Sequence, residues 1–342
     1  MDDEIKPELT YLHWDITGRC NLKCIHCRAT SSEEDKEFTR EEGIDFIKGL
    51  KAFDLEWLSF DGGEPLLRKD DLLQFVKTAK EQGLFTYLLT NGLLLDESIA
   101  GQLKEAGLGS IQVSLDGLKK THNRIRGKGS FEKAVRGIKT AKKAGHRITA
   151  RITLNKFNLD EAKDLLEFVI ELGCEAFGIR RFIPCGRAID NISDLEIDKQ
   201  RYLEVIQSCV KKAGKRIQLQ IGADPVLIPR TYLIEQIKKE YGTTNILAGC
   251  GAGITMCHVN SEGDVYPCST LPISAGNIRK QDLGEIWKNG EIFKVLREGR
   301  KNLKGHCGEC KYTFSCGGCR ASALYYKNDV LEYDPYCLVF ED

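Results

Sequence analysis

The sequence predicts an α/β fold, a partial barrel of parallel strands followed by a cysteine-rich domain. Short apolar runs alternate with amphipathic stretches from Tyr11 to about Ile221, as strands alternate with helices. Eight of the 14 cysteines lie between Cys250 and Cys337. Glycines stand where the helices should end, as C-terminal caps do, at Gly83, Gly107, Gly145 and Gly173.

Six strand–helix units are predicted in order. The expected strands are Tyr11–Asp15, Trp57–Asp61, Phe85–Thr90, Ser110–Ser114, Ile148–Leu154 and Ala176–Phe182. The expected helices are Arg40–Lys51, Asp70–Gln82, Glu97–Ala106, Phe131–Ala144, Leu159–Leu172 and Asp198–Ala213. Such units give parallel strands joined by right-handed crossovers. Because a closed barrel needs eight strands, we expect an open (β/α)6 barrel with its chemistry at the carboxyl ends of the strands.

Three regions are expected along the chain: the barrel at 8–222, a bridging segment at 223–248 and a cysteine-rich domain at 249–342. The bridge is predicted to contain a helix, Leu227–Tyr241. The last region is rich in Gly and Cys and offers little apolar core of its own. Bound metal is therefore expected to hold it together.

Composition excludes several functional classes. The chain has 342 residues, with 50 Lys plus Arg against 50 Asp plus Glu, so no basic excess favours nucleic acid and no charge run favours a membrane surface. No apolar run approaches the ~20 residues of a membrane helix, and the acidic N-terminus lacks the features of a signal peptide. A cytoplasmic protein is expected, in which clustered cysteines indicate metal binding or catalysis.

The first cysteine cluster has the spacing C-x3-C-x2-C, formed by Cys20, Cys24 and Cys27 after the first strand. Three thiolates at this spacing can ligate three irons of a [4Fe–4S] cluster and leave the fourth iron open. The alternative is a structural zinc site, which would need a fourth ligand nearby. His26 lies inside the loop and has poor reach for that role.

The chain resembles the radical S-adenosylmethionine (SAM) superfamily, which carries this cysteine motif. The resemblance implies that the open iron chelates SAM and delivers an electron, so that methionine and a hydrogen-abstracting 5′-deoxyadenosyl radical form. Later strand ends resemble the family's SAM pocket in the family's order. The implied contacts are the SAM amino group for Gly62, Gly63, Glu64 and Pro65, the pocket wall for Asn91, the ribose for Ser114 and Asp116, the SAM carboxylate for Arg126, and the adenine for His26. The glycines are expected to let backbone approach the ligand, and the carboxylate of Glu64 suits an ammonium group.

The C-terminal cysteines resemble the SPASM domain, which binds two auxiliary [4Fe–4S] clusters. Its crossed pattern implies one cluster on Cys250, Cys257, Cys268 and Cys319. It implies another on Cys307, Cys310, Cys316 and Cys337. The last spacing is C-x2-C where many family members have C-x3-C. Two structural zinc sites are the alternative.

Three cysteines lie outside both clusters. Cys174 and Cys209 are interpreted as core residues. Cys185 follows the sixth strand at the expected catalytic face, where a redox or substrate role is the less favoured alternative to simple burial.

The substrate is the least determined feature. The segments Leu303–Tyr312 and Asp334–Cys337 resemble the branch of alternative haem and haem d1 synthesis, beside the coenzyme PQQ peptide cyclase. The implied substrate is an iron porphyrinoid with acetate or propionate groups. These carboxylates could pair with Arg180, Arg181 and Arg187. Alternatively, the three arginines form a solvated basic loop.

Two alternative functions and one partner are also expected. The segment Ile221–Pro225 lacks a cysteine expected of the haem synthases. A peptide maturase is therefore an alternative, although the N-terminal peptide-recognition module common in such enzymes is not seen. A non-catalytic iron–sulfur electron carrier is a third candidate function. A reductant such as ferredoxin or flavodoxin is expected.

Overall fold

The computed structural model describes residues 6–28, 36–221, 249–314 and 316–337. In this part of the chain one ten-stranded sheet runs in the order β10-β9-β8-β1-β2-β3-β4-β5-β6-β7. Neighbouring strands from β8 through β7 are parallel, whereas β9 runs antiparallel to β8 and to β10. The strands are β1 (Tyr11–Asp15), β2 (Trp57–Asp61), β3 (Phe85–Thr90), β4 (Ser110–Ser114), β5 (Ile148–Leu154), β6 (Ala176–Arg181), β7 (Gln218–Ile221), β8 (Met256–Val259), β9 (Asp264–Tyr266) and β10 (Gly276–Asn277).

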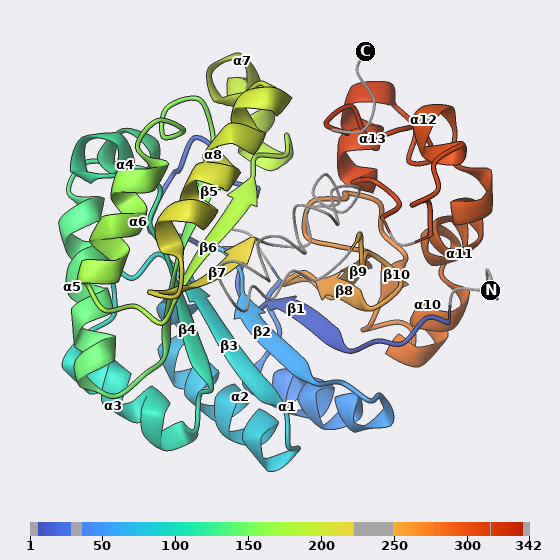
Figure 1. Cartoon of the computed structure of the whole chain (residues 1–342). Helices are drawn as coiled ribbons and strands as arrows, with labels where there is room; N and C mark the ends of the chain where they lie inside the picture. Colours follow the sequence, from blue (N-terminus) through green and yellow to red (C-terminus); the bar gives the residue numbers. More distant parts are fainter. Residues whose placement is uncertain (1–5, 29–35, 222–248, 315, 338–342) are drawn as a thin grey trace.

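Helices cover the outer face of the curved sheet, and a second group of helices lies beyond β8 to β10 (Figure 1). The first group is α1 (Arg40–Gly49), α2 (Lys69–Glu81), α3 (Glu97–Ala106), α4 (Lys119–Arg126), α5 (Ser130–Lys143), α6 (Ala162–Glu171), α7 (Ile192–Leu195) and α8 (Lys199–Ala213). The second is α10 (Leu283–Asn289), α11 (Glu291–Glu298), α12 (Gly305–Gly308) and α13 (Arg320–Lys327). Short 3₁₀ turns are η1 (Leu50–Ala52), η2 (Pro65–Arg68), η3 (Gly186–Asn191) and η5 (Gly299–Asn302).

The predicted strands are confirmed: five have the predicted bounds and β6 ends one residue earlier. The four capping glycines have φ between 70° and 94°, a range that an L side chain rarely adopts. The elements that were not predicted include β7 and α4. β7 alternates polar and buried apolar residues but is only four residues long, and α4 is almost entirely polar, so both signals are weak.

The C-terminal region shares the core of the barrel, which the sequence did not predict. β8 pairs with β1 and extends the barrel sheet into this region. Side chains of α10 and α11 are buried in the same core as the barrel, among them Trp287 and Phe293. The sequence obscured this because the apolar residues are spread over short elements between cysteines. The predicted bridging helix Leu227–Tyr241 lies outside the described residues.

Alternation along the strands separates an apolar outer layer from a polar interior. On β1, Trp14 faces the helices and contacts the rings of Phe46 and Phe75, with centroids 5.1 and 4.9 Å away. The neighbouring residues His13 and Asp15 are buried on the opposite face, since successive side chains of a strand point to opposite sides. The helix-facing layer forms the core, and the polar layer is left to build a site.

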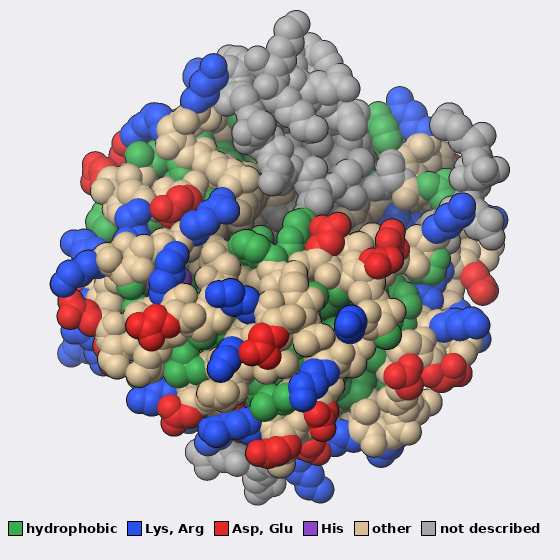
Figure 2. All heavy atoms as spheres, turned by 90° about the horizontal axis from the view of Figure 1, so that it is seen from below, with side chains coloured by type: hydrophobic (Ala, Val, Ile, Leu, Met, Phe, Trp, Pro, Cys, Tyr) green, Lys and Arg blue, Asp and Glu red, His purple; other side chains and the backbone are tan. Residues whose placement is uncertain are grey.

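The surface is mixed in charge. On the face shown in Figure 2, Lys and Arg side chains lie among Asp and Glu side chains, as the balanced composition leads one to expect. Among the described residues, every helix is too short or too polar to cross a bilayer.

Candidate active site

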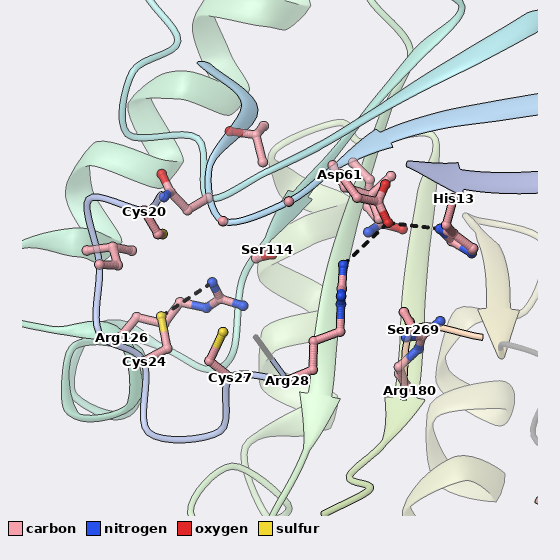
Figure 3. Close-up of a pocket in the computed structure, with 17 residues that line it drawn as sticks. His13, Cys20, Cys24, Cys27, Arg28, Asp61, Ser114, Arg126, Arg180 and Ser269 are labelled. Carbon is pink, nitrogen blue, oxygen red and sulfur yellow. Dashed lines mark hydrogen bonds and ion pairs between the residues drawn. The ribbon is translucent and has the colours of Figure 1, made fainter. Parts of the chain in front are cut away.

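A cavity opens at the carboxyl ends of the barrel strands, with an empty volume of about 780 Å³ measured out to its mouth. The three cysteines of the first cluster line one side, and charged residues line the other (Figure 3). This is the position that parallel α/β barrels use for catalysis. The lining residues are His13, Cys20, Leu22, Cys24, Cys27, Arg28, Asp61, Gly62, Gly63, Leu89, Thr90, Asn91, Gln112, Ser114, Arg126, Arg180 and Ser269.

The cysteine loop follows β1 and is held close to α4. Ile25 N–H donates to the carbonyl of Ile125 at 3.1 Å, and a guanidinium nitrogen of Arg126 lies 3.9 Å from Cys24 Sγ. Burial raises the pKa of Cys24 to about 11, so its thiolate needs compensating positive charge. Arg126 supplies part of that charge, and iron bound at the thiolates would supply the rest.

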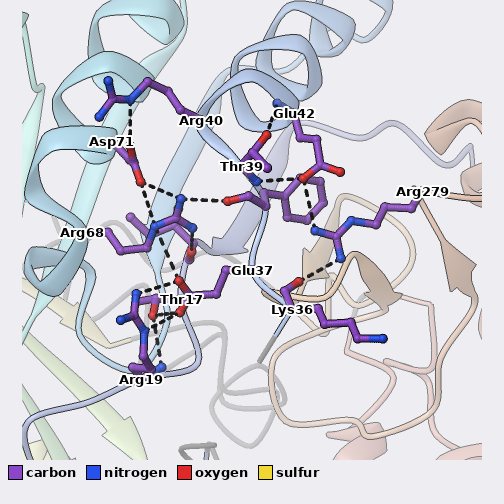
Figure 4. Close-up of polar contacts among 12 residues, drawn as sticks. Thr17, Arg19, Lys36, Glu37, Thr39, Arg40, Glu42, Arg68, Asp71 and Arg279 are labelled. Carbon is purple, nitrogen blue, oxygen red and sulfur yellow. Dashed lines mark hydrogen bonds and ion pairs between the residues drawn. The ribbon is translucent and has the colours of Figure 1, made fainter. Parts of the chain in front are cut away.

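Arg68, which ends η2, fastens the two chain segments that flank this loop (Figure 4). Its guanidinium donates to the carbonyls of Ile16 at 2.7 Å and Phe38 at 2.8 Å. Asp71 accepts from the same group at 2.7 Å. A 9% exposed arginine with these three acceptors fixes where the cysteine loop leaves and rejoins the barrel.

A second contact holds the start of the loop. Glu37 accepts from Arg19 at 2.8 and 3.0 Å and also bonds to the hydroxyl of Thr17. Both ends of the loop are therefore held by protein side chains.

Gly62 and Gly63 allow β2 to meet this loop at very short range. A Cβ on Gly63 would lie 2.1 Å from the carbonyl oxygen of Arg19, and one on Gly62 would lie 2.3 Å from that of Thr17. Gly63 N–H donates to the same Thr17 oxygen at 2.8 Å. The sequence predicted that the glycines admit a ligand; the structure shows that they admit the cysteine loop, while still lining the cavity.

Glu64 lies beneath the cavity wall with no exposed surface. Its carboxylate accepts from Leu66 N–H at 3.1 Å, the Thr90 hydroxyl at 2.7 Å and Asn91 N–H at 2.8 Å. The expected contact with an ammonium group stays a prediction; the structure shows a buried carboxylate that three protein donors orient toward the strand ends. Pro65 starts η2 and is also buried, so both residues shape the pocket from behind.

Asn91 and Ser114 do line the cavity. The Asn91 amide donates to Asn21 Oδ1 at 2.7 Å and accepts from Leu93 N–H at 3.0 Å. These bonds tie the end of β3 to the cysteine loop. Ser114 is half-buried at the end of β4.

Asp116 is fully buried and does not line the cavity. Its carboxylate pairs with Arg126 at 2.5 Å and His26 at 3.0 Å, and accepts from Thr153 N–H at 2.7 Å. Burial opposes its charge, but Arg126 and then His26 hold the pKa of Asp116 well below its ordinary value. The expected ribose contact of Asp116 stays a prediction; in the structure this carboxylate positions Arg126 and His26.

The polar wall opposite the cysteines was not recognised from the sequence. Arg28 donates to both oxygens of Asp15, at 2.7 and 3.1 Å, and His258 Nε2 lies 2.9 Å from the same carboxylate. His13 Nδ1 lies 2.8 Å from Asp61 Oδ2. The available signal was the alternation in β1, which puts two ionisable residues on one face of a buried strand.

The cysteines of one predicted auxiliary set are partly gathered. Burial, and then the charge of Cys250, raise the pKa of Cys268. Burial is the main cause that raises the pKa of Cys319 to about 12, and Cys250 is again among the neighbouring charges. For Cys257 the causes are burial and then Arg297, with no cysteine among them. Cys250 is thus near enough to both Cys268 and Cys319 to affect their pKa values, and the ligand set as a whole, with Cys257, stays a prediction.

The other set shows the same pattern. Burial raises the pKa of Cys316 to about 12, and Cys307 and Cys337 are among its charged neighbours. Cys310 is linked through Thr313, whose hydroxyl bonds to the carbonyls of Cys307 and Cys310. Among the described residues, no three His, Cys, Asp or Glu side chains lie close enough together to hold a single metal ion.

The three remaining cysteines are buried. Cys174 and Cys209 belong to the apolar core, as predicted. Cys185 follows β6, and its electrostatic neighbours include Cys27 and Cys268, so it lies between the first cysteine cluster and the C-terminal region.

Comparison with known proteins gives the family. The "Radical SAM superfamily" pattern matches residues 14–169, and the SPASM "iron-sulfur cluster-binding domain" matches residues 250–311. The AdoMet-dependent heme synthase of Methanosarcina barkeri is 36% identical over 337 residues, covering 95% of each chain. The chain belongs to the radical SAM superfamily. It is accordingly an enzyme that uses SAM and [4Fe–4S] clusters, and it carries a SPASM domain.

Other radical SAM proteins match over most of their length. Mycofactocin maturase MftC of Mycolicibacterium smegmatis is 28% identical over 338 residues, covering 96% of this chain and 82% of the relative. The crystal structure of Streptococcus suis SuiB bound to S-adenosylmethionine superposes with a TM-score of 0.78, at 18% identity, over 98% of this chain and 78% of SuiB. At that identity, the likeness supports the fold alone.

Proposed function

We propose that this radical SAM enzyme acts on acetate or propionate side chains of an iron porphyrinoid. The observation that carries the proposal is one cavity that joins the three-cysteine loop to the guanidinium groups of Arg28, Arg126 and Arg180. Guanidinium groups suit carboxylates. The similarity to a heme synthase along nearly the whole chain supports the same substrate class.

The residues in and around the cavity have different proposed roles. Cys20, Cys24 and Cys27 would hold the SAM-binding cluster, which would supply the electron for cleavage of SAM to methionine and a 5′-deoxyadenosyl radical. Gly62, Gly63, Asn91 and Ser114 border the SAM site, and Arg126 faces its carboxylate. Glu64 and Asp116 position Asn91 and Arg126 from below the cavity. Burial raises the pKa of the Cys24 thiol, so a bound iron ion would stabilise its thiolate, which supports a cluster at this loop.

The substrate reaction is a hydrogen abstraction followed by decarboxylation. A propionate loses one hydrogen atom from the carbon next to the ring, and that atom forms 5′-deoxyadenosine. The substrate radical then releases CO₂ and one electron, which leaves a vinyl group. We propose that an oxidised cluster held by one of the two cysteine sets of the SPASM domain would accept this electron, and that a ferredoxin or flavodoxin would reduce the first cluster.

The test uses anaerobically reconstituted full-length protein. We expect about twelve irons per chain, four for each [4Fe–4S] cluster, and formation of 5′-deoxyadenosine and CO₂ that increases with an iron porphyrinoid carrying propionates. About four irons with bound zinc would remove the auxiliary-cluster assignment. Twelve irons without response to any porphyrinoid would instead favour a peptide substrate, which the similarity to mycofactocin maturase MftC keeps as the second candidate. Absence of all SAM cleavage would favour the electron carrier.

A further inference from the structure

One guanidinium group of the cavity wall has no acidic partner in the part of the chain that the structure describes. Arg180 lines the cavity, and no hydrogen bond or ion pair joins it to another residue in the described part of the chain. The other two guanidinium groups of the wall are paired, Arg28 with Asp15 and Arg126 with Asp116. Arg180 therefore contributes uncompensated positive charge.

The two other arginines predicted near the substrate are engaged elsewhere. The alternation of β6 sends Arg181 away from the cavity, where it pairs with Asp334 at 3.2 Å and lies 4.5 Å from the ring centre of Tyr336. Arg187 donates to the carbonyl of Cys24 at 3.3 Å. Arg180 alone of these three lines the cavity.

A second arginine strengthens the positive charge at this point. Arg151 on β5 is in register with Gly178 of β6, and the missing side chain leaves room for it, since a Cβ there would lie 3.2 Å from Arg151 Cγ. Its hydrogen-bond partner among the described residues is the uncharged Gln112, at 2.7 Å. Burial, and then the like charge of Arg180, lower the pKa of Arg151 to about 9. An anion bound at Arg180 would relieve this repulsion.

The nearby acidic groups are already compensated. Asp61 is bonded to His13 and lies 3.8 Å from Arg28, and Asp15 is held by Arg28 and His258. They leave the guanidinium of Arg180 for a ligand.

We propose that Arg180 binds a carboxylate of the substrate and thereby places the rest of that side chain toward the cysteines. This inference rests on the proposed function and names its anchoring residue. In Figure 3, Arg180 lies beside Ser269, across Arg28 from Arg126 and Cys24. A carboxylate held there is at the opposite end of the cavity from the SAM site.

SAM itself carries a carboxylate, so the experiment must separate the two sources. Arg180→Gln and Arg180→Lys would be titrated anaerobically with iron coproporphyrin III and with its uncharged tetramethyl ester, and SAM binding would be measured by equilibrium dialysis. Arg201→Gln is the matched control, because Arg201 is an exposed arginine of α8. Iron content is measured for every variant.

For Arg180→Gln we expect affinity for the tetra-acid to fall about 10- to 100-fold, as loss of one charge-assisted bond implies. Affinities for the ester and for SAM should stay unchanged, and Lys should restore part of the loss. An unchanged tetra-acid affinity would refute the anchor and leave the proposed function standing. Equal weakening of acid and ester would indicate a structural role, and weaker SAM binding would assign Arg180 to the cofactor; each overturns the inference. A wild-type protein that binds no porphyrin would overturn both proposals.

Discussion

Glu64 offers a direct test of whether the structure or the sequence gives the right role for a motif residue. The change Glu64→Gln replaces one carboxylate oxygen by an NH₂ group and alters little else. In the wild type one oxygen accepts from Leu66 N–H and the Thr90 hydroxyl, and the other accepts from Asn91 N–H. Either orientation of the Gln amide aims a donor at a backbone N–H, so one buried donor loses its acceptor.

Two effects of the change oppose each other. A buried N–H left without an acceptor costs about 1–3 kcal/mol. Burial raises the pKa of Glu64, so removing its charge recovers part of that cost. Because three donors converge on a carboxylate with no exposed surface, we expect the loss of bonds to dominate and stability to fall by about 1–2 kcal/mol.

The assay is urea unfolding of the anaerobic protein, together with equilibrium dialysis of SAM. Glu175→Gln is the control: its carboxylate also accepts from a backbone N–H, that of Ile148 at 2.7 Å, but it is exposed at the other end of the barrel. It should change neither quantity appreciably. If Glu64→Gln left the unfolding free energy unchanged while SAM binding fell more than tenfold, the carboxylate would contact the SAM ammonium directly. Its proposed role of holding the strand ends together would then be wrong.

Two further predictions concern iron and pH. Replacing Cys20, Cys24 and Cys27 together by Ala should remove about four of about twelve irons and abolish SAM cleavage, whereas Cys174→Ala should change neither; an iron assay showing a full complement in the triple variant would contradict the ligand assignment. His122 is fully buried, and burial, then the charge of Arg126, lower its pKa to about 4. Its contribution to stability is therefore complete above pH ~6.5 and lost as pH falls toward ~4, by at most about 3 kcal/mol. Urea unfolding across this range should show a shallower slope for His122→Gln, and an identical slope would show that the imidazole does not titrate as described.

The strands could be predicted because their apolar faces pack against helices. Alternating or continuous apolar runs bounded by glycine fix β1 to β5 to the residue. The pairing of β8 with β1 joins residues more than 240 positions apart, and nothing local encodes it. The four residues of β8 include a cysteine, and this pattern is more typical of a metal-binding loop than of a strand.

The sequence predicted which residues belong to the site, but not which way their side chains point. Spacing places Glu64 and Asp116 at strand ends, where a ligand contact is the natural expectation. Whether a side chain turns into the cavity or beneath it depends on which donors the neighbouring loops offer. Asn91 N–H and Thr153 N–H come from other strands, so a single stretch of sequence does not reveal them.

The distribution of charge in the cavity bears on how a substrate would enter. At the cysteine end, the charge of Arg126 is balanced by Asp116, and thiolates bound to a cluster would make this end negative or neutral. At the Ser269 end, Arg180 has no acidic partner among the described residues, and the like charge of Arg151 is close enough to interact with it. A substrate side chain with a terminal carboxylate is therefore attracted to one end and repelled from the other. Such a chain would present its hydrogen-bearing carbon toward the cysteines because its charged end is held away from them.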